Sequence, residues 1–310
     1  MKEVKTLIGF FCLLLAACSQ SKQSDEKIIS VTIEPQRYFA EKIGGDKFKI
    51  NCLVPPGQSP ETYDPTPQQM IGVGKSAAYL RIGPIGFEQA WMQSIKDNNP
   101  GLRVFDLSEG VHFVDEPEME EAHAAHVHAG EEQASEPASS SAVHTHAAGI
   151  DPHIWSSVGG AKAIAQNTRD AFIALDKENE AYYRENYNRL AAEIDSTGTT
   201  IRHMLEPLRE RTFIIYHPAL TYFALENGLT QLCIEMDGKE PSPAQLKKLV
   251  ETAREHGARV VFIQQEFDQK NAELIARETG CRLVRINPLD YNWKKEMIHI
   301  AKSLADGETD

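Results

Sequence analysis

Cysteine is scarce in this chain of 310 residues, and no Cys-x-x-Cys pair occurs. Cys12 lies in an N-terminal apolar run and Cys18 follows that run, which leaves Cys52, Cys233 and Cys281 for the folded part. Three scattered cysteines exclude a disulfide-rich scaffold and a cysteine-based zinc site. One bridge is compatible with an oxidising compartment, and we expect it between Cys233 and Cys281, with the third thiol buried.

The chain also lacks a long apolar run and an excess of positive charge. The run from Leu7 to Ala17 is too short to span a bilayer. With 32 Lys and Arg against 45 Asp and Glu, the formal net charge of −13 argues against nucleic acid and anionic membrane surfaces as partners, and it favours attraction of cations. Neither His-Glu-x-x-His nor Gly-x-Ser-x-Gly occurs, so two common hydrolase motifs are absent.

The N-terminus has the pattern of a lipoprotein signal. Two lysines precede the apolar run, which ends in Leu15-Ala16-Ala17-Cys18. Small residues followed at once by cysteine resemble a bacterial lipobox, which predicts removal of residues 1–17 and lipidation of Cys18. The protein would then be anchored to a membrane of the cell envelope, with residues 18–27 as a tether. A plain secretory signal that contains Cys18 is the alternative.

Histidine is abundant in one short stretch, which is also strongly acidic. From Asp115 to Glu136 there are eight carboxylates and no Lys or Arg. A segment of this composition, residues 115–148, cannot bury a core and is expected to be mobile. Because imidazole suits zinc, copper and nickel, we expect accessory metal binding there, by His123, His126, His128, His144 and His146. A solvated acidic linker with incidental histidines is the alternative.

The remaining sequence alternates short β-rich runs with helical patterns. This alternation predicts an α/β fold with mainly parallel sheets flanked by helices. We expect two such lobes, residues 28–175 and 207–310, joined by one long connecting helix over residues 176–206. The predicted strands are residues 28–33, 48–54, 78–82, 212–216, 259–263 and 282–286, and two of the predicted helices are residues 243–256 and 269–279.

The connecting helix is predicted from a helical period of apolar residues that runs from Tyr183 to Leu205. It is about twice the mean helix length. Asp176 is the expected N-cap, and Gly198 is a candidate weak point within the helix.

Metal-capable side chains follow the predicted strands at their carboxyl ends, where open α/β sheets place ligands. Glu61 lies in the Pro/Gly loop after the second strand, His217 directly follows the fourth, and Asp290 follows the last. His153 lies in Asp151-Pro-His-Ile-Trp, just after the histidine-rich stretch. Two imidazoles and one or two carboxylates, drawn equally from both halves, predict a zinc or manganese site between the lobes. These residues could instead have ordinary structural roles: Glu61 as a surface charge, His217 as a hydrogen-bonded histidine at a strand end, and Asp290 as a helix cap.

Three segments resemble the zinc/manganese substrate-binding proteins of bacterial ABC importers. They are Val54-Pro-Pro-Gly-Gln-Ser-Pro-Glu-Thr-Tyr-Asp-Pro-Thr-Pro, Asp151-Pro-His-Ile-Trp and Tyr216-His-Pro-Ala-Leu-Thr-Tyr-Phe-Ala. The resemblance covers roughly residues 28–305. It implies two lobes bridged by a long helix, a metal ion bound between them, and delivery of that ion to a membrane permease.

The resemblance places His153 and His217 on the second and third ligand positions of that family. Glu61 stands where the family usually has histidine, and Asn287 stands at the fourth, usually acidic position, so Asp290 or a water would complete the site. Gln264 stands where relatives often carry Glu. Because carboxylate oxygen is a harder ligand than imidazole, these departures keep manganese and iron as alternatives to zinc.

Two functions other than metal import are alternatives for this chain. His144 and His146, with Asp151 and His153, superficially suggest a metallohydrolase, but no placed general base accompanies them, so we expect no enzyme activity. A surface adhesin or storage lipoprotein without transport remains open. We further expect a monomer, and metal affinity that falls as the pH drops through the histidine range near about 6.5.

Overall fold

The computed structural model describes residues 27–114, 149–235 and 241–306. The expected signal peptide, the lipidation site Cys18 and the histidine-rich segment with its five accessory histidines lie outside these ranges.

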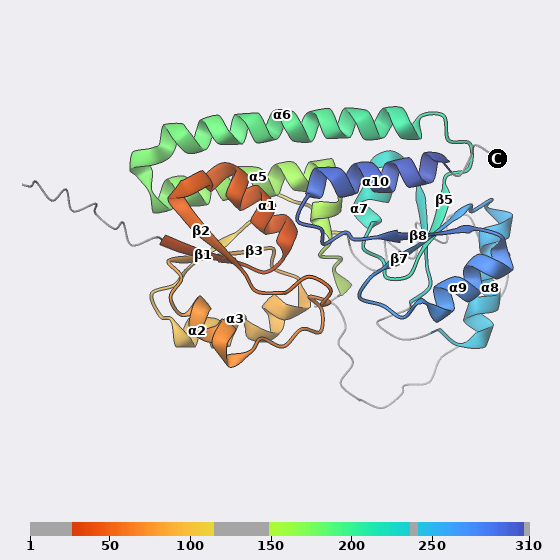
Figure 1. Cartoon of the computed structure of the whole chain (residues 1–310), viewed down its shortest axis with the longest axis horizontal. Coiled ribbons are helices and arrows are strands. Elements are labelled where there is room, and N and C mark those ends of the chain that lie inside the picture. The colour runs from red at the N-terminus through yellow and green to blue at the C-terminus, as the bar shows by residue number, and fades with distance from the viewer. Residues whose placement is uncertain (1–26, 115–148, 236–240, 307–310) are drawn as a thin grey trace, which may run out of the picture.

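Two sheets of four parallel strands form the framework of the molecule (Figure 1). The first has the order β2-β1-β3-β4 and the second the order β6-β5-β7-β8. We call the parts built around them the N-terminal and C-terminal lobes. The strands are β1 (Lys27–Val31), β2 (Phe48–Cys52), β3 (Ala78–Arg81), β4 (Arg103–Asp106), β5 (Thr212–Ile215), β6 (Thr230–Cys233), β7 (Val260–Gln264) and β8 (Arg282–Ile286).

The predicted α/β fold with parallel sheets is confirmed, and so are all six predicted strands. The two strands that the sequence did not indicate, β4 and β6, are edge strands of four residues. Their sequences, Arg-Val-Phe-Asp and Thr-Gln-Leu-Cys, do not alternate polar with apolar residues and are too short to give a clear pattern. The carboxyl ends of β5, β7 and β8 lead into the loops that line the pocket described below.

Helices cover both sheets, and their ends follow familiar local rules. The helices α2 and α8 each begin with a capping box and a proline, at Thr66 and Ser242 respectively. The helix α9 ends at Gly280, which has a φ of 77°. Both predicted helices are confirmed, as α8 and α9. The helices other than α6 are α1 (Glu34–Gly44), α2 (Pro67–Val73), α3 (Gly86–Asn98), α5 (Val158–Leu175), α7 (Thr221–Asn227), α8 (Pro243–Glu255), α9 (Gln269–Thr279) and α10 (Trp293–Ala305).

The long helix α6 (Glu180–Leu205) confirms the predicted connecting helix, with two corrections. Asp176 is not its N-cap, because a short 3-10 turn intervenes and the Asp176 carboxylate accepts a hydrogen bond from the Tyr183 hydroxyl (2.6 Å). Gly198 is not a weak point, because the helix runs through it without a break. A Cβ at Gly198 would lie 3.0 Å from a methyl group of Val158, so the glycine permits close packing of α5.

The two lobes share one hydrophobic core. The helix α6 packs against α1 and α5 of the N-terminal lobe and against α10, which follows β8 (Figure 1). A single cluster of buried residues includes Phe39 beside the first sheet and Phe262 in the second, with Trp155 and Trp293 between them. Because such a core resists deformation, it disfavours wide opening about a flexible hinge.

The expected disulfide is wrong, since Cys52, Cys233 and Cys281 all have free thiols. Cys233 ends β6, whereas Cys281 precedes β8, and these strands form opposite edges of the sheet. Because the strands are parallel, the two cysteines also lie at opposite ends of them, and no bridge can form. The expected burial of the third thiol is only partly met, because Cys52 is half-buried.

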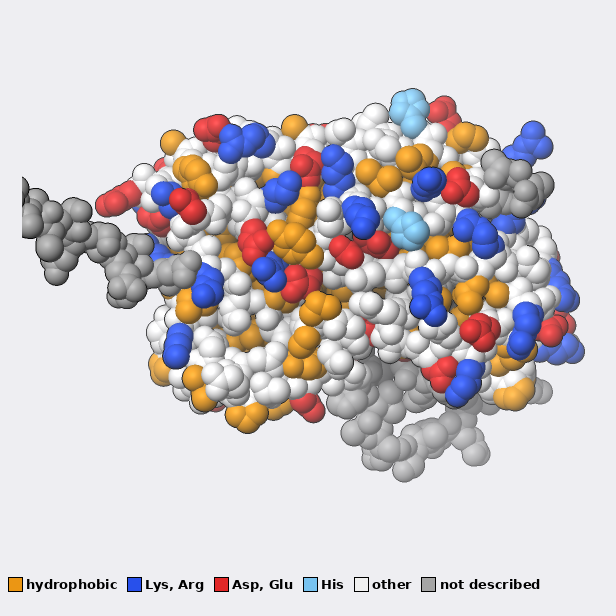
Figure 2. Space-filling view, viewed as in Figure 1, with side chains coloured by type: hydrophobic (Ala, Val, Ile, Leu, Met, Phe, Trp, Pro, Cys, Tyr) orange, Lys and Arg blue, Asp and Glu red, His pale blue; other side chains and the backbone are white. Residues whose placement is uncertain are grey.

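The visible face of the molecule carries charges of both signs (Figure 2). Figure 2 shows Lys and Arg interspersed with Asp and Glu over the visible face. Within the described ranges, no helix has the length and apolar character needed to cross a bilayer.

Candidate metal site

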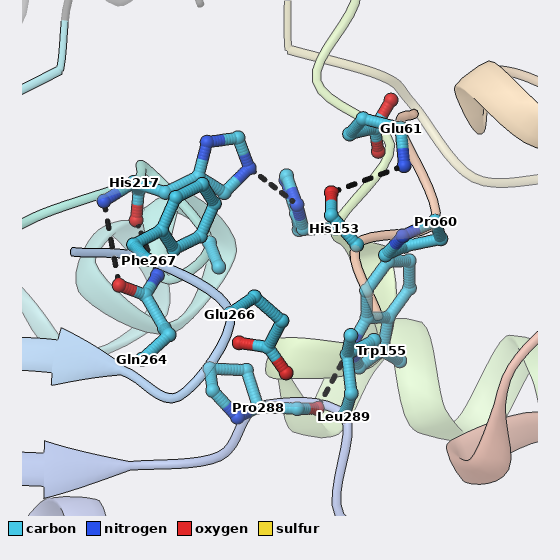
Figure 3. Close-up of a pocket in the computed structure, with 12 residues that line it drawn as sticks. Pro60, Glu61, His153, Trp155, His217, Gln264, Glu266, Phe267, Pro288 and Leu289 are labelled. Carbon is cyan, nitrogen blue, oxygen red and sulfur yellow. Dashed lines mark hydrogen bonds between the residues drawn. The ribbon is translucent and has the colours of Figure 1, made fainter. Parts of the chain in front are cut away.

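A pocket between the lobes holds two buried imidazoles that face one another (Figure 3). Nε2 of His153 lies 3.3 Å from Nε2 of His217. His153 follows the end of the histidine-rich segment, and His217 follows β5, so the structure brings together two residues that are 64 positions apart. The pocket is lined by Ser59, Pro60, Glu61, His153, Trp155, His217, Ala219, Gln264, Glu266, Phe267, Pro288 and Leu289.

Carboxylates orient both imidazoles from behind. Nδ1 of His153 donates to Asp151 Oδ1 (2.8 Å), and Nδ1 of His217 donates to Glu235 Oε2 (3.2 Å). Burial opposes ionisation of Asp151, but the neighbouring His153 outweighs it and lowers the pKa of Asp151, so this carboxylate is ionised. Partners of this kind fix ring orientation and tautomer at metal-binding histidines.

Because Nδ1 of each ring carries the proton, the Nε2 atoms of both rings have lone pairs, and these are directed at the same point. Two such lone pairs 3.3 Å apart repel unless a proton or a cation lies between them. Two nitrogens at about 2.0–2.1 Å from a tetrahedral zinc ion are about 3.3–3.4 Å apart. The pair therefore has the spacing and the donor type that a zinc ion requires.

The segment that carries His153 bridges the two lobes. The indole Nε1 of Trp155 donates to Pro288 O (3.0 Å), and Nε1 of Trp293 donates to Trp155 O (2.6 Å). The Tyr222 hydroxyl donates to Asp151 O (2.8 Å). The amide of Asp151 donates to Val114 O of the N-terminal lobe (3.0 Å), so the His153 segment is connected to both lobes.

Glu61 reaches the pocket from the N-terminal lobe, and the start of α3 fixes it there. The amide of Gly86 donates to Glu61 Oε2 (3.0 Å), and the amide of Phe87 donates to Pro60 O (2.8 Å). A negative charge is stabilised at this end of a 13-residue helix. A Cβ at Gly86 would lie 2.6 Å from Glu61 O, so only glycine admits this loop. The carboxylate of Glu61 is therefore already engaged by the helix.

The loop that presents Gly86 is itself held by Glu88. This carboxylate is 2% exposed and accepts hydrogen bonds from Ile82 N, Gly83 N and the Thr32 hydroxyl. Burial raises the pKa of Glu88 to about 7, against the donors that favour its ionised form.

The raised pKa of Glu88 predicts a specific loss of stability with rising pH. Because the folded state holds this proton more tightly than the unfolded state does, the contribution to stability is full below the ordinary pKa and is lost as the pH rises through about 7. Between about pH 5 and about pH 8, we expect the unfolding free energy of the metal-free protein to fall by up to about 3 kcal/mol more than that of Glu88→Gln. Urea denaturation at stepped pH measures this difference, and parallel curves would contradict it.

Glu266 is a pocket residue that the sequence reading missed. It follows β7 by two residues, and its Oε1 is buried without a hydrogen-bond partner among the described residues. Burial raises the pKa of its carboxyl, while His217 acts in the opposite direction. The rule that selected His217, a metal-capable side chain just after a strand, also applies after residues 259–263 and would have found it.

Gln264 has a structural role in place of a ligand role. Its Nε2 donates to His217 O (2.7 Å) and its Oε1 accepts from His217 N (3.4 Å), so the amide holds the backbone of His217 from both sides. The ring of Phe267 stacks on the His217 imidazole, at 5.1 Å between centroids. Gln264 and Phe267 together position His217.

Contrary to expectation, neither Asp290 nor Asn287 lines the pocket. Asp290 Oδ1 accepts from Asn292 N (2.7 Å), and Asn287 Oδ1 accepts from Leu289 N (3.2 Å). Both side chains shape the turn into α10, so their oxygens are occupied by backbone donors two residues on.

The described residues do not preassemble a complete ligand cage. No group of three or more His, Cys, Asp or Glu within residues 27–114, 149–235 and 241–306 is placed to hold a metal ion together. The imidazole pair is the preorganised part of the site, and a carboxylate has to turn toward it to supply a third ligand.

Comparison with known proteins agrees with this geometry. Residues 29–307 match the family described as zinc-uptake complex component A, periplasmic. The high-affinity zinc uptake system protein ZnuA of Bacillus subtilis is 28% identical over 295 residues, which cover 92% of this chain and 87% of that protein. The zinc-binding lipoprotein AdcA of Streptococcus pneumoniae is 25% identical over 294 residues. Those residues are 94% of this chain but 56% of AdcA, so the chain spans little more than half of that relative.

Solved structures show the same fold. A crystal structure of ZnuA superposes with a TM-score of 0.79 at 33% identity, covering 91% of this chain and 99% of the other. A ZnuA deletion mutant with zinc bound gives the same TM-score at 32% identity, covering 92% and 99%. Because the family match extends over nearly all of the described residues, this chain belongs to the zinc-uptake complex component A family.

Proposed function

We propose that this protein binds a divalent transition metal ion outside the cytoplasm, with zinc as its main cargo, and delivers it to an ABC permease for import. The observation that carries this proposal is the buried imidazole pair, with 3.3 Å between the two Nε2 atoms and a carboxylate behind each ring. The names of the relatives, which are zinc uptake and zinc-binding proteins, support the same cargo.

Zinc is preferred over manganese and iron because the preorganised donors are nitrogens. The two carboxylates that line the pocket, Glu61 and Glu266, are harder ligands and keep manganese or iron as the second candidate. Element analysis of protein purified without chelator or affinity tag decides between these metals. A preparation that retains manganese or iron in stoichiometric amount, and no zinc, would reject zinc as the cargo.

Deleting residues 115–148 is expected to leave one tight zinc site. The imidazole pair and its supporting carboxylates lie outside this segment, and the amide of Asp151 donates to Val114 O (3.0 Å), which closes its stem. Titration calorimetry should show weak additional binding lost and the tight site retained.

If the tight site vanishes with residues 115–148, the accessory histidines are the binding site and the pocket assignment fails. A second deletion restricted to residues 131–141, which contain no histidine, is the matched control for shortening the segment. It should change neither the tight site nor the weak binding.

The proposal includes a lipid anchor at the N-terminus and two lobes joined by one helix. Residues 1–17 act as a lipoprotein signal, Cys18 carries the anchor, residues 18–27 form the tether, and the protein works in the cell envelope as a monomer. The lobes comprise residues 28–175 and 207–310, joined by the helix over residues 176–206. The shared core and the long helix favour metal release through small shifts of the lobes or loops when the permease docks.

Two other functions are less well supported. A surface metal-binding adhesin or storage lipoprotein without transport would bind metal through the histidine-rich residues 115–148, and the presence of adjacent ATPase and permease genes would argue against it. Hydrolase activity would need an open metal position and a placed general base; hydrolysis assays with added zinc test for it.

A further inference from the structure

The pocket contains two carboxylates, and their surroundings differ. Glu61 Oε2 already accepts a hydrogen bond from Gly86 N at the start of α3. Turning Glu61 toward the imidazoles would break this bond and remove its charge from the positive end of the helix. Glu61, which stands where the family usually has histidine, is thus bound to the start of α3 in the N-terminal lobe.

Glu266 enters the pocket from the other lobe. It lies in the loop after β7, in the lobe that also carries His217, and Figure 3 shows it between His153 and Pro288 in the pocket. Its Oε1 is buried without a hydrogen-bond partner among the described residues. A buried acceptor left unsatisfied costs about 1–3 kcal/mol, which a bound cation would recover.

The loop that bears Glu266 is also coupled to His217. Gln264, two residues earlier, holds both backbone groups of His217, and Phe267, one residue later, stacks on its imidazole. A short segment thus fixes the backbone of Glu266 relative to one of the two nitrogen donors. A rotation of the Glu266 side chain alone can then change its distance to the imidazole pair.

We propose that Glu266 is the carboxylate ligand that completes the metal site with His153 and His217. It takes over the acidic role that Asn287 cannot fill in this chain, while Glu61 remains at the start of α3 as part of the pocket wall. This inference rests on the proposed function, since it assumes that the imidazole pair binds the metal. It joins two ligands of the C-terminal lobe, His217 and Glu266, to His153 of the segment that bridges the lobes.

The test compares Glu266→Gln with Glu61→Gln, with Glu273→Gln on the exposed face of α9 as the matched control. We expect Glu266→Gln to weaken zinc binding by at least about tenfold to a hundredfold in calorimetry. That is the loss typical of removing a residue that only hydrogen-bonds to a metal ligand, and a ligand itself should cost no less. Glu61→Gln should change affinity less than about threefold, because an amide oxygen still accepts from Gly86 N. With cobalt(II) as the probe, the visible bands typical of four-coordinate cobalt should weaken only in Glu266→Gln.

Stability of the metal-free protein distinguishes a ligand from a structural residue. Glu266→Gln removes a half-buried charge whose Oε1 makes no hydrogen bond among the described residues, so resistance to urea should stay the same or rise while zinc affinity falls. A parallel loss of stability and affinity, reproduced by Glu266→Asp, would indicate a structural role and overturn the inference. So would wild-type zinc affinity in Glu266→Gln. If the wild-type protein itself binds no zinc, the proposed function fails, whatever the variants do.

Discussion

Replacing His217 by Ala is expected to weaken zinc binding by at least about a thousandfold, which corresponds to at least about 4 kcal/mol of binding free energy. The substitution removes one of two preorganised nitrogen donors and leaves Glu235 without the imidazole that it orients. His153→Ala should have an effect of similar size, because Asp151 then becomes a fully buried carboxylate without its main partner. Competition titration with a zinc chelator of known affinity measures both losses.

His203→Ala is the matched control for these substitutions. His203 is exposed on α6 and does not line the pocket, so zinc affinity should not change. The double variant His153→Ala, His217→Ala should be little weaker than either single variant, since the pair acts as one unit. Retention of tight zinc binding in the double variant would show that the ligands lie elsewhere.

Replacing Trp293 by Ala is expected to destabilise the metal-free protein by about 3–5 kcal/mol. Its indole is 1% exposed, packs against Phe39 of the N-terminal lobe at 5.6 Å between ring centroids, and donates to Trp155 O. The substitution opens a cavity in the core that the lobes share and frees the segment that carries His153. Urea unfolding of the metal-free protein measures the loss.

Lys295→Ala, two residues away on the exposed side of α10, should change stability by no more than about 0.5 kcal/mol. Trp293→Phe separates packing from hydrogen bonding, since it keeps most of the ring volume and loses the donor to Trp155 O. A loss below about 1 kcal/mol in Trp293→Ala would mean that the two lobes do not depend on a shared core.

Much of the fold could be predicted from local pattern. The six predicted strands and the helices α8 and α9 are present because strand runs and capping signals act over a few residues. The edge strands β4 and β6 escaped prediction because four residues carry too little periodicity. The expected disulfide failed for a different reason, since the order of strands in a sheet determines which cysteines can meet and the spacing of cysteines does not reveal it.

The candidate site was predicted less completely than the fold. The motifs placed His153 and His217 at loop positions suited to metal binding, and the structure brings them together. Asp290 and Asn287 also lie near a strand end, yet nearby backbone amides take their oxygens. Strand-end position is thus not a sufficient sign of a ligand.

The sequence alone determined the α/β class, the parallel sheets, the long helix and the resemblance to metal-binding proteins of importers, because these depend on local periodicity and contiguous motifs. Only the tertiary structure decided which side chains face the pocket. It attached the His153 segment to the C-terminal lobe through Trp155 and Tyr222, engaged Glu61 with the start of α3, and left a Glu266 oxygen buried without a donor. The physical reason is that the direction of a side chain depends on hydrogen-bond partners far away in the sequence, such as the Gly86 amide for Glu61, 25 positions away.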